Sequence, residues 1–195
     1  MALKRMSAAL DQLVSTPWGV ADEKKEYGEG ITFYGTSSHG GFKLDRARNA
    51  KVHPALRESG GWYEEDSAWA KVAFTFPERF SENERESAAR TLKQWYPDAW
   101  EAVTGTIVAP GESYIKDERL FREKHANDLI VISAISSKKH PGMVECIATK
   151  GGIRAEWGKR DPEELRCLVP AGEYGQRSKF GFVVDPARHQ PFDDK

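Results

Sequence analysis

Two glycine-rich clusters organise this sequence, because glycine allows sharp turns that other residues resist. The first cluster is residues 35–42, GTSSHGGF, and the second is residues 60–69, GGWYEEDSAW. Each places a glycine pair beside aromatic rings and beside side chains that can act as acids, bases or ligands. The first cluster follows a strand-like segment, residues 31–34. A functional site is therefore expected where the two clusters lie.

The pattern of apolar residues predicts an α+β protein with one compact domain, residues 1–195, and a loose tail at 186–195. Helices are expected mainly in the first two thirds of the chain, and an antiparallel sheet largely in the last third. The sequence SENE at residues 81–84 is a capping box, which predicts a helix behind it. The glycines of residues 150–152, KGG, predict a tight hairpin.

The remaining periodic segments give the other predicted elements. The predicted helical segments are a helix over 3–14, a helical turn over 44–50 capped by Asp45, and a helix after residue 67 capped by Asp66 or Ser67, for which a strand over 70–76 is the alternative. Residues 21–30 are predicted as a loop. The predicted strands are 106–108, 143–149 and 153–157, together with a buried strand over 129–135.

Composition narrows the classes of protein that this chain can be. A hydrophobic content of 39% is typical of a folded globular protein. The 29 Lys and Arg residues nearly balance the 30 Asp and Glu residues, so net charge does not indicate a nucleic-acid partner. The chain also lacks the glycine-rich motifs of nucleotide-binding loops, so nucleotide binding is not predicted.

The location that the sequence predicts is the cytoplasm. No apolar run is long enough to cross a membrane. The first basic and apolar residues pass into Asp11 before the apolar region of an export signal can form. Cys146 and Cys167 lack further ligands at the spacing of a zinc site, and we expect two buried thiols. No cofactor is expected, and the sequence leaves the oligomeric state open.

His39, Glu64 and Glu65 are the candidate catalytic residues. The neighbours of His39 are small, so its ring could face a ligand as a general base or a metal ligand, or it could hydrogen-bond its own turn. Consecutive carboxylates point in different directions, so at most two of residues 64–66 can converge with His39 on a divalent metal ion. Alternatively, one of them caps the helix that follows.

The predicted binding residues come from the two clusters and from the turn at residues 16–19, TPWG. Trp18 and Trp62 follow turn-forming residues, so they could be exposed anchors of a binding surface, or could pack within loops. The complete predicted set is Trp18, Ser38, Phe42, Trp62, Tyr63 and Asp66.

Several segments together resemble an uncharacterised domain family of bacterial plasmids, integrative elements and phages. They are TPWG at 16–19, SHGGF at 38–42, GWYEED at 61–66, LVP at 168–170, EY at 173–174 and FGFVVD at 180–185. The resemblance implies an accessory or host-interaction role, such as blocking a bacterial defence system in the manner of an anti-CRISPR protein. It implies no particular chemistry.

Two functions follow as hypotheses. The first is a phage or mobile-element protein that binds a host protein or protein complex. The alternative is a small metal-assisted hydrolase or nuclease that uses His39 with the carboxylates of residues 64–66. The discriminating feature is whether the histidine and the carboxylates converge in the fold.

Overall fold

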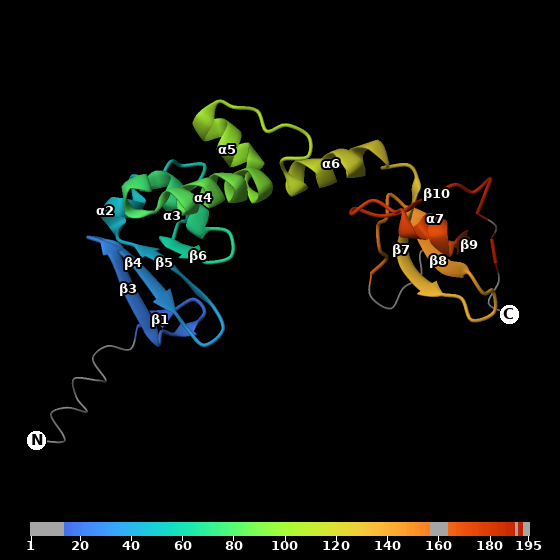
Figure 1. Cartoon of the computed structure of the whole chain (residues 1–195), viewed down its shortest axis with the longest axis horizontal. Coiled ribbons are helices and arrows are strands. Elements are labelled where there is room, and N and C mark those ends of the chain that lie inside the picture. The colour runs from blue at the N-terminus through green and yellow to red at the C-terminus, as the bar shows by residue number, and fades with distance from the viewer. Residues whose placement is uncertain (1–13, 157–163, 190, 193–195) are drawn as a thin grey trace, which may run out of the picture. The chain divides into compact units, whose positions relative to one another are not determined.

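The computed structural model describes residues 14–156, 164–189 and 191–192. The chain forms two compact units, Met1–Ile115 and Lys116–Lys195, each with its own four-stranded antiparallel sheet (Figure 1). The predicted α+β class is confirmed, whereas the sequence had indicated one domain. The helix predicted over residues 3–14 lies almost entirely outside the described residues.

The first unit is built on the sheet β3-β4-β5-β6. Its strands are β3 (Glu23–Gly28), β4 (Ile31–Gly35), β5 (Gly40–Leu44) and β6 (Trp62–Glu64). A small hairpin, β1 (Ser15–Thr16) and β2 (Gly19–Val20), precedes them. The strand predicted over residues 31–34 is confirmed as β4, which pairs with β5 so that Phe33 lies opposite Phe42.

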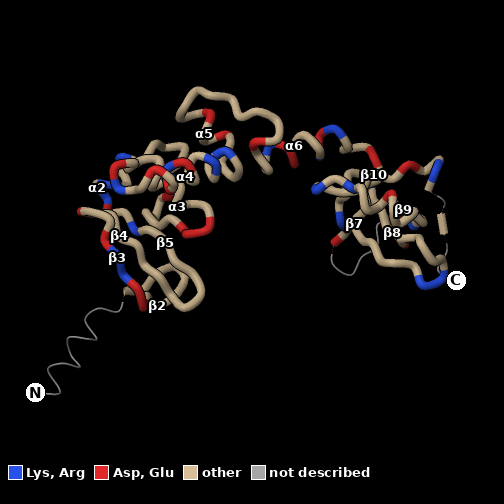
Figure 2. The backbone as a smooth tube through the Cα atoms, viewed as in Figure 1, with Lys and Arg blue, Asp and Glu red and all other residues tan. Residues whose placement is uncertain are grey.

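Strand β3 occupies residues that the sequence predicted as a loop, and that prediction is wrong. The first four residues of β3, EKKE, are all charged (Figure 2), so no hydrophobic period was visible. In the sheet, β3 pairs only with β4. A strand at an edge can remain exposed, and its charges disfavour pairing with another chain.

Helices follow the sheet in the first unit. They are α2 (Arg46–Asn49), α3 (Trp69–Thr75), the short 3-10 helix η1 (Pro77–Arg79), α4 (Glu82–Trp95) and α5 (Pro97–Thr104). The predicted capping box begins α4, where the Ser81 hydroxyl accepts from Glu84 N and the Glu84 carboxylate accepts from Ser81 N. The Ser81 hydroxyl, which also donates to the Glu84 carboxylate at 2.6 Å, and the bond from Ser81 N together lower the pKa of Glu84. Asp45 caps α2 as predicted.

Two predictions around these helices are wrong. Helix α3 begins after Ala68 without a side-chain cap, instead of after Asp66 or Ser67. Residues 106–108 form no strand. Gly105 ends α5 in the left-handed conformation, with a φ of 68°, and the segment after it runs irregularly.

Alternation along the strands places the core of the first unit on one face of its sheet. Ile31, Phe42, Leu44 and Tyr63 are buried there against apolar residues of α3 and α4. Successive strand residues point to opposite faces. The other face, which we call the outer face, therefore carries the residues between them, and Trp62 is one of these.

The second unit contains the sheet β10-β7-β8-β9. Its strands are β7 (Leu129–Ser136), β8 (Met143–Lys150), β9 (Leu165–Pro170) and β10 (Val183–Val184). Helix α6 (Tyr114–Lys124) starts at the end of the first unit, and α7 (Ala171–Gly175) follows β9. No described helix has both the length and the apolar character needed to cross a membrane.

The glycine hairpin predicted at residues 150–152 does not form. Gly151 and Gly152 have the positive φ of a turn, but residues 153–156 form no strand, and β8 pairs with β7 and β9. Strand β7 exists as predicted but is only partly buried, since Ile135 is 63% exposed. An unbroken apolar run therefore indicated a strand here without indicating burial on both faces.

In the expected loose tail, residues 186–188 and 191 are exposed, whereas His189 is packed against the second unit. His189 is buried, and its Nδ1 accepts a hydrogen bond from Asp185 N at 3.0 Å. The neutral ring then carries its proton on Nε2, which donates to Glu173 Oε1 at 3.2 Å. Pro191 bridges to Cys167 of β9. The last three residues lie outside the described part.

The buried cysteines face each other across the second sheet. Cys146 in β8 pairs directly with Cys167 in β9, and both are reduced and fully buried, as predicted. Burial raises the pKa of both thiols, and that of Cys146 reaches about 12, with the neighbouring Cys167 as a second cause.

We expect Gly41→Ala to lower the free energy of unfolding by about 1–3 kcal/mol, as overpacking does. A Cβ there would lie 2.3 Å from the Trp18 ring and 2.4 Å from the backbone oxygen of Tyr63. Urea denaturation followed by tryptophan fluorescence measures this. The control is Gly60→Ala, whose nearest contact is at 3.8 Å, and which should change stability by less than about 0.5 kcal/mol. Equal stability of the two variants would contradict the proposed packing.

We expect both cysteines of the folded protein to resist iodoacetamide at pH 8. A thiol with a pKa near 12 leaves only about one molecule in ten thousand as the reactive thiolate at that pH. Both should react in strong denaturant, and mass spectrometry counts the added groups. Rapid alkylation without denaturant would show that the cysteines of β8 and β9 are accessible to the reagent in the folded protein, which would contradict their burial.

Candidate functional site

The two glycine-rich clusters meet at one end of the first sheet. Gly35 and Gly40 face each other where β4 and β5 begin to separate into their hairpin. The second cluster reaches the same point, because Glu65 N donates to Gly40 O at 3.0 Å. Residues about 25 positions apart in the chain therefore have adjacent backbones.

The turn between β4 and β5 is held by Thr36. Its backbone N–H and its hydroxyl both donate to His39 O at 2.7 Å, and the hydroxyl accepts from His39 N at 3.2 Å. Ser38 and His39 are exposed at this tip. In the part of the chain that the structure describes, the His39 ring forms no hydrogen bond or ion pair. The turn is therefore held by Thr36 and not by the His39 imidazole.

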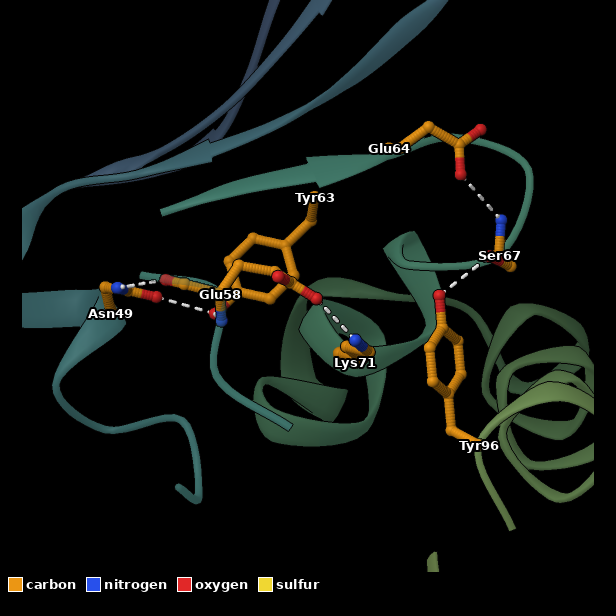
Figure 3. Close-up of polar contacts among 7 residues, drawn as sticks. All are labelled: Asn49, Glu58, Tyr63, Glu64, Ser67, Lys71 and Tyr96. Carbon is orange, nitrogen blue, oxygen red and sulfur yellow. Dashed lines mark hydrogen bonds and ion pairs between the residues drawn. The ribbon is translucent and has the colours of Figure 1, made fainter. Parts of the chain in front are cut away.

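The three carboxylates point in different directions. Glu64 accepts hydrogen bonds from the backbone N–H groups of Asp66 and Ser67, which fix the turn before α3. Figure 3 shows the bond to Ser67. The Glu65 carboxylate lies on the helix side, against Gly40, and lines a pocket of about 340 Å³. Asp66 is exposed. The carboxylate-cap hypothesis is therefore wrong, because α3 has no side-chain cap, and Glu64 instead holds the turn before the helix.

The described residues contain no group of three or more His, Cys, Asp or Glu side chains placed to hold a metal ion. His39 and the carboxylates of residues 64–66 share one end of the sheet but form no hydrogen bond or ion pair with each other there. The arrangement places an exposed imidazole near an acidic turn.

Two of the predicted binding residues are core residues instead. Phe42 is 4% exposed and Tyr63 is fully buried. They lie opposite each other in β5 and β6, on the face that packs against the helices. The prediction failed because both stand beside glycines and charged residues in the sequence, which hid the alternation of the strands.

Trp18 and Trp62, in contrast, come together on the outer face. Their rings lie 5.7 Å apart, edge to face, and the Tyr34 ring lies 5.7 Å from Trp62. All three are partly exposed, and none belongs to the core of the first unit. We call Trp18, Tyr34 and Trp62 the aromatic face.

Trp18 reaches the outer face because the β1–β2 hairpin folds over the sheet. Thr16 holds that hairpin, since its hydroxyl donates to Gly19 O at 2.8 Å and accepts from Trp18 N at 3.1 Å. The Trp18 ring then packs directly on the backbone of Gly41, which has no side chain to keep the ring away. Gly41 was predicted to permit a turn, but in the structure it allows an aromatic ring to pack against the strand.

A polar network on the helix side of the sheet holds the second cluster in place (Figure 3). Tyr63 donates to Asn49 Oδ1 at 2.6 Å and accepts from Glu58 N at 3.2 Å, and its burial raises the pKa of its hydroxyl. Lys71, which is 6% exposed, binds Glu58 Oε1 at 2.5 Å and lies 3.9 Å from the centre of the Tyr96 ring. This network ties β6 to α2, α3 and the end of α4.

Sequence reasoning missed Tyr34 and Lys71. Tyr34 was assigned to a strand, but its face could not be chosen before the register of β4 was known. Lys71 interrupts the otherwise apolar run of residues 68–74, and a lysine inside such a run was the available signal for a buried charge.

The fold and the site together define an α+β domain whose outer sheet face gathers three partly exposed aromatic rings. Residues 11–126 match the family described as Domain of unknown function (DUF7007). The chain belongs to this family, whose match covers the described first unit and all of α6. The segments of residues 168–185 that entered the resemblance lie outside the match. No curated protein and no solved structure matches the chain.

We expect Glu58→Gln to destabilise the protein more than Lys71→Met does. The Lys71 side chain is 7% exposed, so losing its partner leaves a charge without compensation, at a cost of about 3 kcal/mol. The Glu58 side chain is 42% exposed and can be hydrated alone. Methionine matches lysine in length, so Lys71→Met should cost less than about 1.5 kcal/mol. Urea denaturation of both variants measures the order, and the reverse order would contradict the burial of the Lys71 charge.

Proposed function

We propose that this protein is an accessory protein of a phage or mobile genetic element, acting in the cytoplasm of a bacterial host by binding a host protein or protein complex. A defence complex is the partner class that this context favours. The observation that carries the proposal is the aromatic face, on which three partly exposed rings gather from separate segments.

The chemistry of the aromatic face suits protein recognition. Tryptophan and tyrosine supply much of the binding energy of protein interfaces, because each buries a large rigid area at a small cost in entropy. Trp62 is held by its neighbours, since Lys43 Nζ lies 4.8 Å from its ring centre and Trp18 meets it edge to face. A pre-positioned ring loses little freedom on binding.

Charged side chains around the rings supply the polar rim that such interfaces have. Lys24 and Glu26 of β3 form an ion pair at 2.9 Å, and both side chains are more than half exposed. Glu64 lies on the same face, in the row of Tyr34 and Gly41. The mixture of signs around the rings favours a protein surface over a strongly charged polymer.

The mobile-element context rests on the resemblance of the clusters at residues 38–42 and 61–66, both within the family match. The alternative function, a metal-assisted hydrolase or nuclease, has no specific observation in its favour. Glu64, one of its candidate catalytic residues, accepts two backbone hydrogen bonds that fix the turn before α3.

The test is affinity capture from a bacterial host that carries the mobile element, followed by purification of the captured protein. We expect Trp62→Ala to weaken its binding to purified partner by about 30-fold or more, as a hot-spot residue does. Trp95→Ala is the matched control, because Trp95 is 46% exposed but lies outside the aromatic face. Thermal denaturation establishes that each variant is folded.

Trp18→Ala should weaken the same complex, since it removes the ring that supports Trp62. A partner whose affinity falls equally with Trp95→Ala, or is untouched by both Trp18→Ala and Trp62→Ala, would overturn the proposed surface.

A further inference from the structure

A second concave site lies at the opposite end of β5 from the His39 turn. It is a pocket of about 360 Å³ between the end of β5, helix α2 and the loop before β6. We call it the basic pocket, and its lining residues that matter here are Lys43, Asp45, Arg46, Arg57, Gly60 and Gly61. The three cations against one carboxylate leave a net charge of two positive units.

Two of these cations are held by neutral carbonyl groups. Lys43 Nζ donates to Gly60 O at 2.7 Å. The Arg57 guanidinium donates from Nε and Nη2 to Val52 O, at 3.0 and 2.7 Å, and from Nη2 to Ala50 O at 2.9 Å. A carbonyl orients a cation but does not cancel its charge. The Nη1 donors of Arg57 have no partner in the described part of the chain.

The one carboxylate of the pocket is already used. Asp45 Oδ1 accepts from Arg48 N at 2.7 Å as the cap of α2. Across the described ranges, neither Lys43, Arg46 nor Arg57 forms an ion pair, although lysine and arginine elsewhere in the first unit do, as Lys71 does with Glu58. The pocket thus holds three cationic side chains, and none of them forms an ion pair with a carboxylate of the described residues.

We propose that the basic pocket binds a small ligand through a phosphate monoester group. A dianionic phosphate would balance the two net charges, whereas one carboxylate would balance only half. Arginine matches phosphate geometry with parallel N–H donors, and charge-assisted hydrogen bonds of this kind are the strong ones. The volume falls within the range of small-molecule sites. The near-zero net charge of the whole chain is compatible with anion binding, because the pocket concentrates positive charge locally.

This inference goes beyond the proposed function and does not rest on it. The basic pocket and the aromatic face border each other only at Lys43, whose ammonium lies over Trp62. The ligand of the pocket is an anion, while the aromatic face would bind apolar and mixed surface. One site can fail its test while the other passes.

The experiment is an NMR titration of the full chain with inorganic phosphate, adenosine 5′-monophosphate and adenosine, at constant ionic strength. The two phosphate-bearing probes should shift the backbone amides of Gly60 and Gly61 in a saturable way, and adenosine should not. Arg46→Glu should weaken phosphate binding by about tenfold or more, the size of one lost charge-assisted hydrogen bond. Arg46 is exposed on α2 and caps nothing, so the fold should survive.

Arg85→Glu is the matched control, because it makes the same change of net charge at an exposed site on α4. Its affinity for phosphate should stay within about twofold of the natural chain, as expected for a distant exposed charge. Equal weakening by Arg85→Glu and Arg46→Glu would overturn the site, since binding would then follow net charge. Absence of saturable shifts at Gly60 and Gly61, or shifts by adenosine as large as those by the monophosphate, would also overturn it.

Discussion

The packing of the Trp18 ring on the bare backbone of Gly41 is the contact on which the outer face of the first sheet depends. This contact holds the β1–β2 hairpin against the sheet. It also places the Trp18 ring edge to face with the Trp62 ring, at 5.7 Å. The next residue, Phe42, faces the opposite way into the core. A single strand thus separates a packed aromatic interior from an aromatic surface, by its alternation alone.

The turn before α3 is stabilised from two sides. The Glu64 carboxylate accepts hydrogen bonds from backbone N–H groups of the turn. On the helix side, the Ser67 hydroxyl forms a hydrogen bond with the Tyr96 hydroxyl at 2.8 Å. The same region contains the buried Lys71, compensated by Glu58. Glu64, a candidate catalytic carboxylate, is therefore part of the framework of this turn.

The first unit carries two surfaces of different character along one strand. The aromatic face lies over the middle of β5, and the basic pocket lies at its end, with Lys43 contributing to both. The second unit is built differently, around a sheet with a sealed cysteine pair and a buried histidine. The family match accounts for the first unit, so both proposals concern the part of the chain that defines the family.

Local signals were the ones that sequence reasoning used correctly. The Ser81–Glu84 capping box, the Asp45 cap and the two buried cysteines each depend on neighbours within a few residues or on simple hydrophobicity. The edge strand β3 was missed because an exposed strand needs no apolar period, and the hairpin at residues 150–152 was overpredicted because glycine pairs permit turns without pairing the strands beside them.

The sequence by itself determined the α+β class, the helices α2, α3 and α4, the strands β4, β7 and β8, and where chemistry-bearing residues are concentrated. Only the tertiary structure decided that Trp18 and Trp62 share a surface while Phe42 and Tyr63 are buried. It alone collected Lys43, Arg46 and Arg57 around one pocket. The physical reason is register: a shift of one residue exchanges the two faces of a strand, and register is set by contacts between segments distant in the chain.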